Sequence, residues 1–258
     1  INNRNTESSL GKLASGSRIT KAADDAAGLA ISEKLRSQIK STVQADRNAN
    51  DGISMIQVAE GGLNEVQNIL TRLRELGIQS ASDTVGDTER GFTDMEYQQL
   101  KLELQRISEV TEFNGSKLLD GSGDIYDFQI GVHNDDFQDR IKFDAGFTNA
   151  SLDNLEIDSL AVDSKEGAQE SLESVDSAIE SVSRFRANLG AIQNRLISTT
   201  QNLQVSSENL QAANSRIRDT DYALETATNS RNTILNSAGT SVLAQANVNG
   251  QNALRLIG

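Results

Sequence analysis

The stretch from Leu172 to Ala238 decides the fold, and it reads LESVDSAIESVSRFRANLGAIQNRLISTTQNLQVSSENLQAANSRIRDTDYALETATNSRNTILNSA. Apolar residues recur along it at alternating spacings of three and four, and the intervening residues are mostly Ser, Asn, Gln, Glu and Arg. This heptad stripe contains no proline, so it predicts one helix roughly 100 Å long at the usual rise per residue. A compact globule of 258 residues would measure only about 45–50 Å across. The sequence therefore predicts an elongated molecule and favours a structural or assembly protein over an enzyme.

The composition excludes several classes of protein. The chain contains neither proline nor cysteine, and its net charge is −13. The lack of proline favours long helices, because each internal proline costs a helix about 3 kcal/mol. The lack of cysteine excludes disulfides and thiolate metal sites, and the negative charge argues against nucleic-acid binding. No apolar run approaches the ~20 residues of a membrane span, and residues 1–20 have no apolar signal-peptide core, so we expect no membrane insertion and no cleavable signal peptide.

A second helical pattern precedes this stretch and runs from Leu35 to about Ser80. Upstream of it, the carboxylates of Asp24 and Asp25 suit the start of a helix, where backbone N–H groups lack partners. Residues 50–52, Asn-Asp-Gly, normally predict a turn. The heptad phase resumes after them without loss, so we favour a continuous helix over a break at this point.

A third helix and a β-hairpin are expected between the two long helical patterns. Residues 91–112 have helical spacing, and Asn114-Gly115 is expected to end this helix by C-terminal capping. The period then changes to two on both sides of Asn134-Asp135-Asp136, which predicts a hairpin at about residues 125–144. Its alternating apolar residues are Tyr126, Phe128, Ile130, Val132, Phe137, Ile141 and Phe143.

These elements predict a mainly α fold: an elongated antiparallel coiled-coil helical bundle with one small β-hairpin region. We assign residues 29–216 to the bundle and treat residues 1–28 and 217–258 as terminal arms. The residues expected in the intramolecular seam are Leu63, Leu70, Leu189, Leu196 and Leu203.

The C-terminal arm carries an apolar face that the weak arm at residues 1–20 is too short to cover. This face consists of Leu224, Ile234, Leu235, Val242, Leu243, Leu254, Leu256 and Ile257. Isolated helices gain most of their stability from packing such a face. We therefore expect the arm to be exposed within its own chain, disordered in the free monomer, and ordered when other copies bury it.

Several ordered blocks at both ends of the chain resemble bacterial flagellin. They are Leu13-Ala-Ser-Gly-Ser-Arg-Ile19, Ala23-Asp-Asp-Ala-Ala-Gly28, Arg47-Asn-Ala-Asn-Asp-Gly-Ile-Ser54, Glu60-Gly-Gly-Leu-Asn-Glu65, Phe113-Asn-Gly115, Leu189-Gly-Ala-Ile-Gln-Asn-Arg195, Ser215-Arg-Ile-Arg-Asp-Thr-Asp-Tyr222 and Gly239-Thr-Ser-Val-Leu-Ala-Gln-Ala-Asn247. The resemblance implies a structural subunit that polymerises into an extracellular flagellar filament for swimming. It also implies that the terminal arms form a small inner domain lining the filament channel, while the bundle forms the outer wall.

The resemblance implies further partners besides copies of the chain itself. These are the flagellar export apparatus, an export chaperone, and the filament cap and junction proteins. Two features depart from the family pattern. Residues 146–163 leave no room for the usual hypervariable outer domain, so the chain is expected to be a minimal flagellin. The resemblance also implies that the N-terminal arm is short by roughly five helical turns.

Two rival functions remain open at this point. The nearest is a hook–filament junction protein, which shares the N-terminal fold, although the block at residues 239–247 favours flagellin. The other is a flagellin with protease activity. Its H-E-x-x-H zinc motif needs two histidines, whereas His133 is the only histidine in the chain. We therefore expect no catalytic, cofactor or metal site, and we interpret His133 as a solvated turn residue and Asp135, Asp136 and Asp139 as surface charge.

The resemblance also implies a candidate innate-receptor contact, because a vertebrate Toll-like receptor senses flagellin through its first bundle helices. The matching residues are Arg72, Leu76 and Glu96. Arg72 and Leu76 are four residues apart and so share a helix face, and Glu96 is expected to face them from the third helix. An ordinary Arg–Glu surface pair beside a core leucine explains the same residues equally well.

Overall fold

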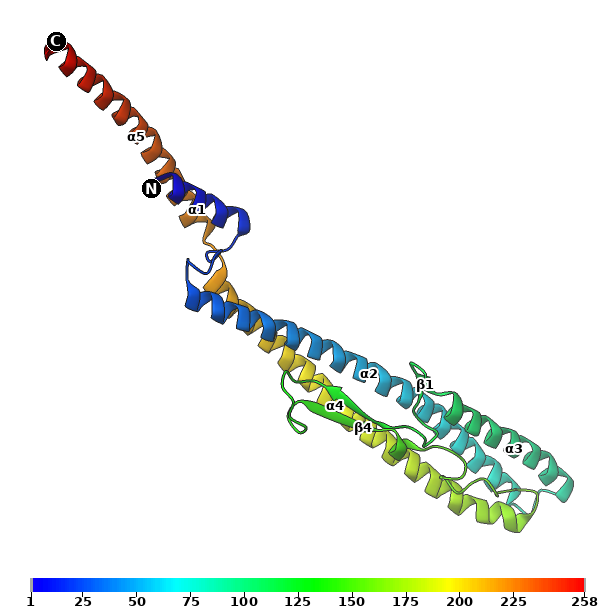
Figure 1. Ribbon diagram of the computed structural model, residues 1–258. Helices are drawn as coiled ribbons and strands as arrows, with labels where there is room; N and C mark the ends of the chain where they lie inside the picture. The colour runs from blue at the N-terminus through cyan, green and yellow to red at the C-terminus, as the bar shows by residue number, and fades with distance from the viewer. Residues whose placement is uncertain (1, 258) are drawn as a thin grey trace. The chain divides into compact units, whose positions relative to one another are not determined.

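The computed structural model describes residues 2–257, with side chains described for residues 3–248. The chain divides into two compact units. We call Ser41–Val205 the bundle unit, and Ile1–Lys40 with Ser206–Gly258 the terminal unit. The helices are α1 (Asn2–Ser15), α2 (Ala26–Ser80), α3 (Asp87–Val110), α4 (Lys165–Arg218) and α5 (Tyr222–Ile257) (Figure 1). The short elements are β1 (Glu112–Phe113), β2 (Ser116–Lys117), β3 (Ile125–Gln129), β4 (Arg140–Asp144) and the 3-10 turn η1 (Gly146–Thr148).

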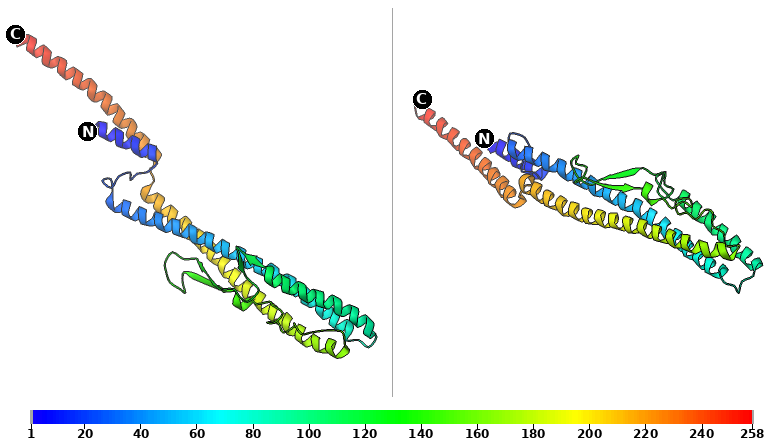
Figure 2. Two further views of the ribbon diagram at one scale, coloured as in Figure 1. Left: turned by 45° about the vertical axis from the view of Figure 1, so that its right-hand side comes forward. Right: turned by 90° about the horizontal axis from the view of Figure 1, so that it is seen from below.

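The predicted mainly α fold with a small hairpin region is confirmed. In the bundle unit α2 and α4 run antiparallel, because Arg74 pairs with Asp176 whereas Gln67 pairs with Arg186. The α3 helix and the β3–β4 hairpin complete the layers around this pair (Figure 2). No helix among the described residues is long and apolar enough to cross a membrane.

Four of the five predicted seam leucines lie in the core. Leu63, Leu70, Leu189 and Leu196 have no exposed surface. Leu203 is only half-buried, so its predicted burial is wrong. The α3 helix and the β3–β4 hairpin each cover part of the α2–α4 pair (Figure 2). Leu203 nevertheless keeps part of its surface open to water.

The α2 helix is continuous through residues 50–52, as favoured from the heptad phase. Gly52 has a packing role there, because an added Cβ would lie 3.0 Å from the ring of Phe128 on β3. The helix begins at Ala26, directly after Asp25, and the Asp25 carboxylate accepts a hydrogen bond from the Gly28 N–H at 2.8 Å. The carboxylate thus caps the first turn in the way that the sequence predicted.

The predicted role of Asn114-Gly115 is wrong. The α3 helix is capped at Thr111, whose N–H donates to the Ile107 carbonyl. Asn114 and Gly115 have φ angles of 51° and 79° and form a two-residue turn that pairs Phe113 with Ser116. Left-handed Asn-Gly turns match the twist of adjacent strands, so this dipeptide closes a small β1–β2 hairpin.

The β3–β4 hairpin pairs Ile125 with Asp144 at one end and Gln129 with Arg140 at the other. Ile141 and Phe143 are buried, and the Phe143 ring stacks on Tyr126 with centroids 6.1 Å apart. The apolar alternation predicted strands reaching Val132 and Phe137, whereas both residues lie in the exposed connecting loop 130–139. Polar contacts of that loop, described below, end the strand pairing early.

The single helix predicted for Leu172 to Ala238 is also wrong, because α4 ends at Arg218 and α5 starts at Tyr222. The Asp221 carboxylate accepts hydrogen bonds from the N–H groups of Ala223 and Leu224 and so caps α5. At the same point Asp219 forms an antiparallel bridge with Ser17. The heptad stripe continues across the break, but these backbone contacts replace helical ones.

Candidate functional site

The turn between α4 and α5 is held by residues 16–19. The Arg18 N–H donates to the Arg218 carbonyl at 2.6 Å, and the Thr220 N–H donates to the Gly16 carbonyl at 3.0 Å. The Arg18 guanidinium also donates to the Ile217 carbonyl at 2.8 Å. Carbonyls in the last turn of a helix have no partner inside the helix. Residues 16–19 supply those partners and so determine where α4 ends.

Side-chain contacts attach this turn to the start of α2. The Arg218 guanidinium donates to the Glu33 carboxylate at 2.7 Å and to the Ser32 hydroxyl at 3.4 Å. The hydrogen bond from Arg218 lowers the pKa of Glu33 below its usual value. Ile19 is buried beside Gly28, where an added Cβ would lie 2.8 Å from the Ile19 side chain. The turn between α4 and α5 is therefore held by specific contacts and is not a frayed helix end.

Polar groups join α1 to α5 within the terminal unit. The Tyr222 hydroxyl donates to the Leu13 carbonyl at 3.0 Å, and the Asn236 amide donates to the Thr6 hydroxyl at 3.3 Å. Ser9 and Asn232 are buried, whereas Leu10 is half exposed. The α1 helix has 14 residues and α5 has 36, so most of α5 lies beyond the reach of α1.

The apolar face of α5 is open to water. The exposed fractions are 67% for Leu224, 68% for Ile234, 47% for Leu235, 68% for Val242 and 65% for Leu243. The predicted exposure of these five residues is therefore confirmed. Leu254, Leu256 and Ile257 belong to the same prediction but lie outside the residues whose side chains are described. Contiguous exposed apolar surface of this kind is typical of interaction sites.

The three receptor-contact candidates lie on α2 and α3 in the bundle unit. Arg72 donates to Glu96 at 2.8 Å and to Glu75 at 2.9 Å, and the hydrogen bond to Glu96 is the main reason that the pKa of Arg72 is raised. Arg72 on α2 and Glu96 on α3 therefore contact each other, as expected from the sequence. Leu76 is 2% exposed and belongs to the core, so only Arg72 and Glu96 present side chains at the surface.

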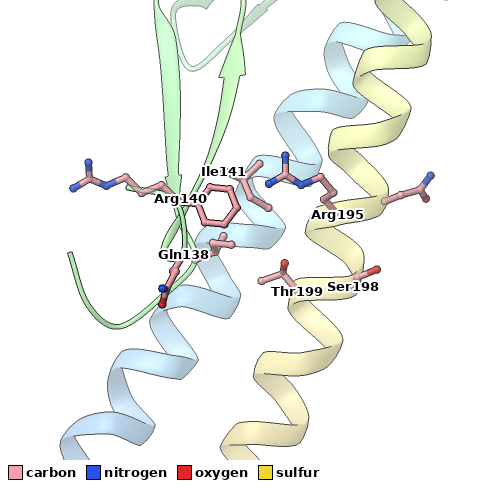
Figure 3. A pocket seen from close by; sticks show the side chains of 9 residues that line it. Gln138, Arg140, Ile141, Arg195, Ser198 and Thr199 are labelled. Carbon is pink, nitrogen blue, oxygen red and sulfur yellow. The ribbon is translucent and has the colours of Figure 1, made fainter. Parts of the chain in front are cut away.

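A groove separates the β3–β4 loop from α4 and has a volume of about 470 Å³. Figure 3 shows Gln138 on the loop side and Arg195 and Thr199 on the α4 side. Phe137 also lines the groove, although its side chain is 90% exposed. An exposed phenyl group was not anticipated, because its place in the alternation resembled that of a buried strand residue.

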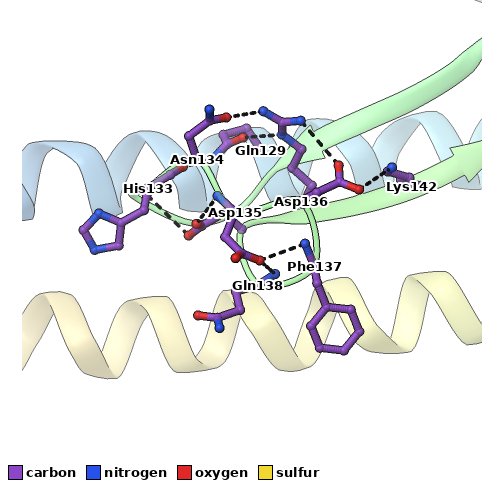
Figure 4. A network of polar contacts seen from close by, with 10 residues as sticks. Gln129, His133, Asn134, Asp135, Asp136, Phe137, Gln138 and Lys142 are labelled. Atoms are coloured by element: carbon purple, nitrogen blue, oxygen red, sulfur yellow. Dashed lines mark hydrogen bonds and ion pairs between the residues drawn. The ribbon is translucent and has the colours of Figure 1, made fainter.

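Asp135 and Asp139 bond to the backbone of loop 130–139 itself, whereas Asp136 pairs with Arg140 and Lys142 on β4. Asp139 is buried and accepts a hydrogen bond from the Asp135 N–H at 3.0 Å, and Asp135 accepts from the N–H groups of Phe137 and Gln138 (Figure 4). His133 is exposed, as expected of a solvated turn residue. Among the described residues no group of three or more His, Cys, Asp or Glu side chains has the arrangement of a metal site.

Comparisons with known proteins cover nearly the whole chain. Residues 1–124 match the family model described as "Bacterial flagellin N-terminal helical region", and residues 172–257 match "Bacterial flagellin C-terminal helical region". The chain is 44% identical over 257 residues to "Flagellin" of Halalkalibacterium halodurans, covering 100% of this chain and 93% of the relative. It is 41% identical over 269 residues to "Flagellar filament 30.7 kDa core protein" of Treponema maltophilum, covering 100% and 94%. The crystal structure of Bacillus cereus flagellin aligns with a TM-score of 0.55 and 29% identity, over 65% of this chain and 94% of that one.

Proposed function

The chain belongs to the bacterial flagellin family, and from this premise we propose that its terminal helices α1 and α5 join copies into the filament. The protein is a structural subunit that polymerises into the flagellar filament for swimming motility, outside the cell. Its relatives along the full length are a flagellin and a filament core protein, which favours this role over that of a hook–filament junction protein.

The exposed apolar face of α5 carries the proposal. Burying a large aliphatic side chain contributes about 1.5–3 kcal/mol, so burial of these five residues favours association and offsets part of the entropy cost of ordering the helix. The α1 helix contributes mainly polar contacts and leaves this face open. We assign its burial to other copies, with the arms 1–28 and 217–258 as the inner, channel-lining domain and Leu254, Leu256 and Ile257 continuing the same interface.

The exposed apolar face of α5 also has consequences for export and assembly. An aliphatic helix face must be kept from nonspecific association before it meets its neighbours. We therefore propose that an export chaperone covers α5 until the chain passes through the flagellar export apparatus without a cleavable signal peptide. Assembly would then involve the filament cap and junction proteins. The role is structural, and no catalytic, metal or cofactor residues are proposed.

Polymerisation of purified full-length chain, followed by electron microscopy and sedimentation, tests the role of α5. We expect filaments from the unmodified chain and a much higher critical concentration for Ile234→Asp combined with Val242→Asp, because two carboxylates would be buried without partners. The matched control is Thr240→Asp, an exposed polar position on the side of α5 away from Ile234 and Val242 that should polymerise normally. Normal assembly of the double variant would overturn the assignment of α5 to the contact between copies.

Recognition by a flagellin-sensing vertebrate Toll-like receptor is a second proposal, and the exposed Arg72–Glu96 pair supports it. Because Leu76 is buried, it would pack beneath the Arg72–Glu96 pair and would not contact the receptor directly. In a reporter-cell assay the monomer should activate the receptor, and Arg72→Ala should weaken activation. Arg74→Ala is the matched control, because Arg74 pairs instead with Asp176 on α4. An unmodified monomer without activity would end this proposal.

A further inference from the structure

On α3, most of the buried residues are polar or charged, whereas several large apolar residues are exposed. Its buried residues are Arg90, Thr93, Tyr97, Lys101, Leu104 and Ser108. Phe92, Met95, Leu102 and Val110 are 59–64% exposed. At about 100° per residue these four positions lie on the side of the helix opposite the buried residues. We call them the α3 stripe. An ordinary surface helix places polar residues there, so an exposed aliphatic and aromatic stripe indicates a partner surface.

The orientation of α3 is secured by its polar buried residues. Arg90 donates to the carbonyls of Ser80 at 2.8 Å and Ser82 at 2.9 Å. Lys101 donates to the carbonyls of Asp158 at 2.5 Å and Leu160 at 2.9 Å. Rotating the stripe inward would leave both cations and these carbonyls without partners, at a large energetic cost. The stripe therefore faces outward as part of the fold.

A second exposed apolar group is Phe137 on loop 130–139. Its backbone N–H donates to Asp135, and Asp135 is held in turn by the buried Asp139. Lys142 pairs with Asp136 in the same loop at 2.8 Å (Figure 4). These contacts fix the backbone that presents an almost fully exposed phenyl group. A fixed backbone leaves less conformational entropy to lose on docking, and aromatic side chains are typical of interface hot spots.

Charged side chains that form no ion pair among the described residues lie beside both surfaces. The stripe is flanked on α3 by the exposed carboxylates of Glu89 and Glu109, whereas Glu96 pairs with Arg72 and the exposed Arg106 pairs with Glu103. Arg195 lines the groove beside Phe137 and is exposed, and within the described part of the chain no ion pair involves it. A cation beside the phenyl group and carboxylates beside the stripe favour one mutual orientation.

We propose that Phe137 of one copy docks on the α3 stripe of a second copy, with Arg195 facing the carboxylates that flank the stripe. The inference rests on the filament role proposed above and adds a contact that is separate from the terminal helices. Within the bundle unit the β3–β4 loop and α3 occupy different positions along the helices (Figures 1 and 2). A contact between two different surfaces repeats head to tail, and it builds a helical filament when the rotation between copies does not close a ring.

Cysteine cross-linking tests the contact without altering either surface, because the natural chain has no cysteine. Gln138→Cys places a thiol next to Phe137, and Gln99→Cys places one within the α3 stripe; both positions are exposed. The two full-length variants are mixed, polymerised and oxidised, and covalent dimers are measured on a denaturing gel. The control mixture pairs Gln99→Cys with Asp127→Cys, an exposed position on the same hairpin.

We expect dimers from the Gln138→Cys and Gln99→Cys mixture, and none from either variant alone or from the control mixture. Adding Phe137→Ser to the Gln138→Cys chain should reduce the cross-linked fraction about 10-fold, as expected for loss of an interface hot spot. Filaments that form without this cross-link, or a cross-link insensitive to Phe137→Ser, would overturn the inference and leave the filament role intact. Failure of the unmodified chain to polymerise would overturn the filament role and this inference together.

Discussion

The bundle unit and the terminal unit are built from the same heptad pattern but bury very different amounts of apolar surface. The bundle unit has a continuous core that includes Leu63, Leu70, Leu189 and Leu196. Among the described residues of the terminal unit, Ile19 is the one large apolar side chain that is fully buried. Heptad spacing thus specifies a helix but not what covers it, and a third layer over α2 and α4 distinguishes the unit that closes its own core.

The largest expected effect separates the two units directly. Leu189→Ala should lower the free energy of unfolding by about 2–5 kcal/mol, because it removes a fully buried side chain from the bundle core. Ile234→Ala on α5 should change the stability of the monomer by no more than about 0.5 kcal/mol, since Ile234 is already hydrated. Denaturant unfolding followed by circular dichroism measures both. Equal losses would mean that the terminal unit has a core of its own.

A smaller effect is expected at Leu203, which keeps part of its surface exposed. Leu203→Ala should lower the free energy of unfolding by roughly 1–2 kcal/mol, less than Leu189→Ala, because part of the Leu203 side chain is hydrated before the substitution. Thermal melts of the unmodified chain and of both variants show which substitution lowers the stability more. If Leu203→Ala were as damaging as Leu189→Ala, the seam at Leu203 would be as well packed as the seam at Leu189.

The smallest effect concerns acid and the turn at the end of α4. Because Arg218 holds the pKa of Glu33 below its usual value of 4.5, the ion pair stabilises the fold above that pH. Its contribution is lost as the pH falls through the lowered folded-state pKa. Unfolding free energies measured across this range should fall less steeply for Glu33→Gln than for the unmodified chain, and Arg218→Gln should behave in the same way. Identical slopes would show that the pair does not stabilise the terminal unit.

Much of the bundle could be predicted from local pattern. The continuous α2 helix, the start of α2 after Asp25 and the hairpin near residues 125–144 all follow from spacing and capping chemistry. The candidate surfaces were less accessible to such reasoning. Leu76 shares a helix face with Arg72, but α2 is covered on several sides, so one residue is buried and the other exposed. Phe137 was missed because it was assigned to the hairpin alternation, and the sequence pattern led to no prediction for the face of α3 that carries the stripe.

The sequence by itself determined the helical pattern, the absence of helix-breaking proline and the apolar face of the C-terminal arm, because each depends on residues a few positions apart. Only the tertiary structure decided where the long heptad stripe breaks. The pairing of residues 16–18 with residues 218–220 competes there with helical hydrogen bonds, and it joins segments about 200 positions apart in the chain. Periodicity carries no information about such a distant backbone partner. An apolar stripe can therefore continue along the sequence although the helix that carries it is broken.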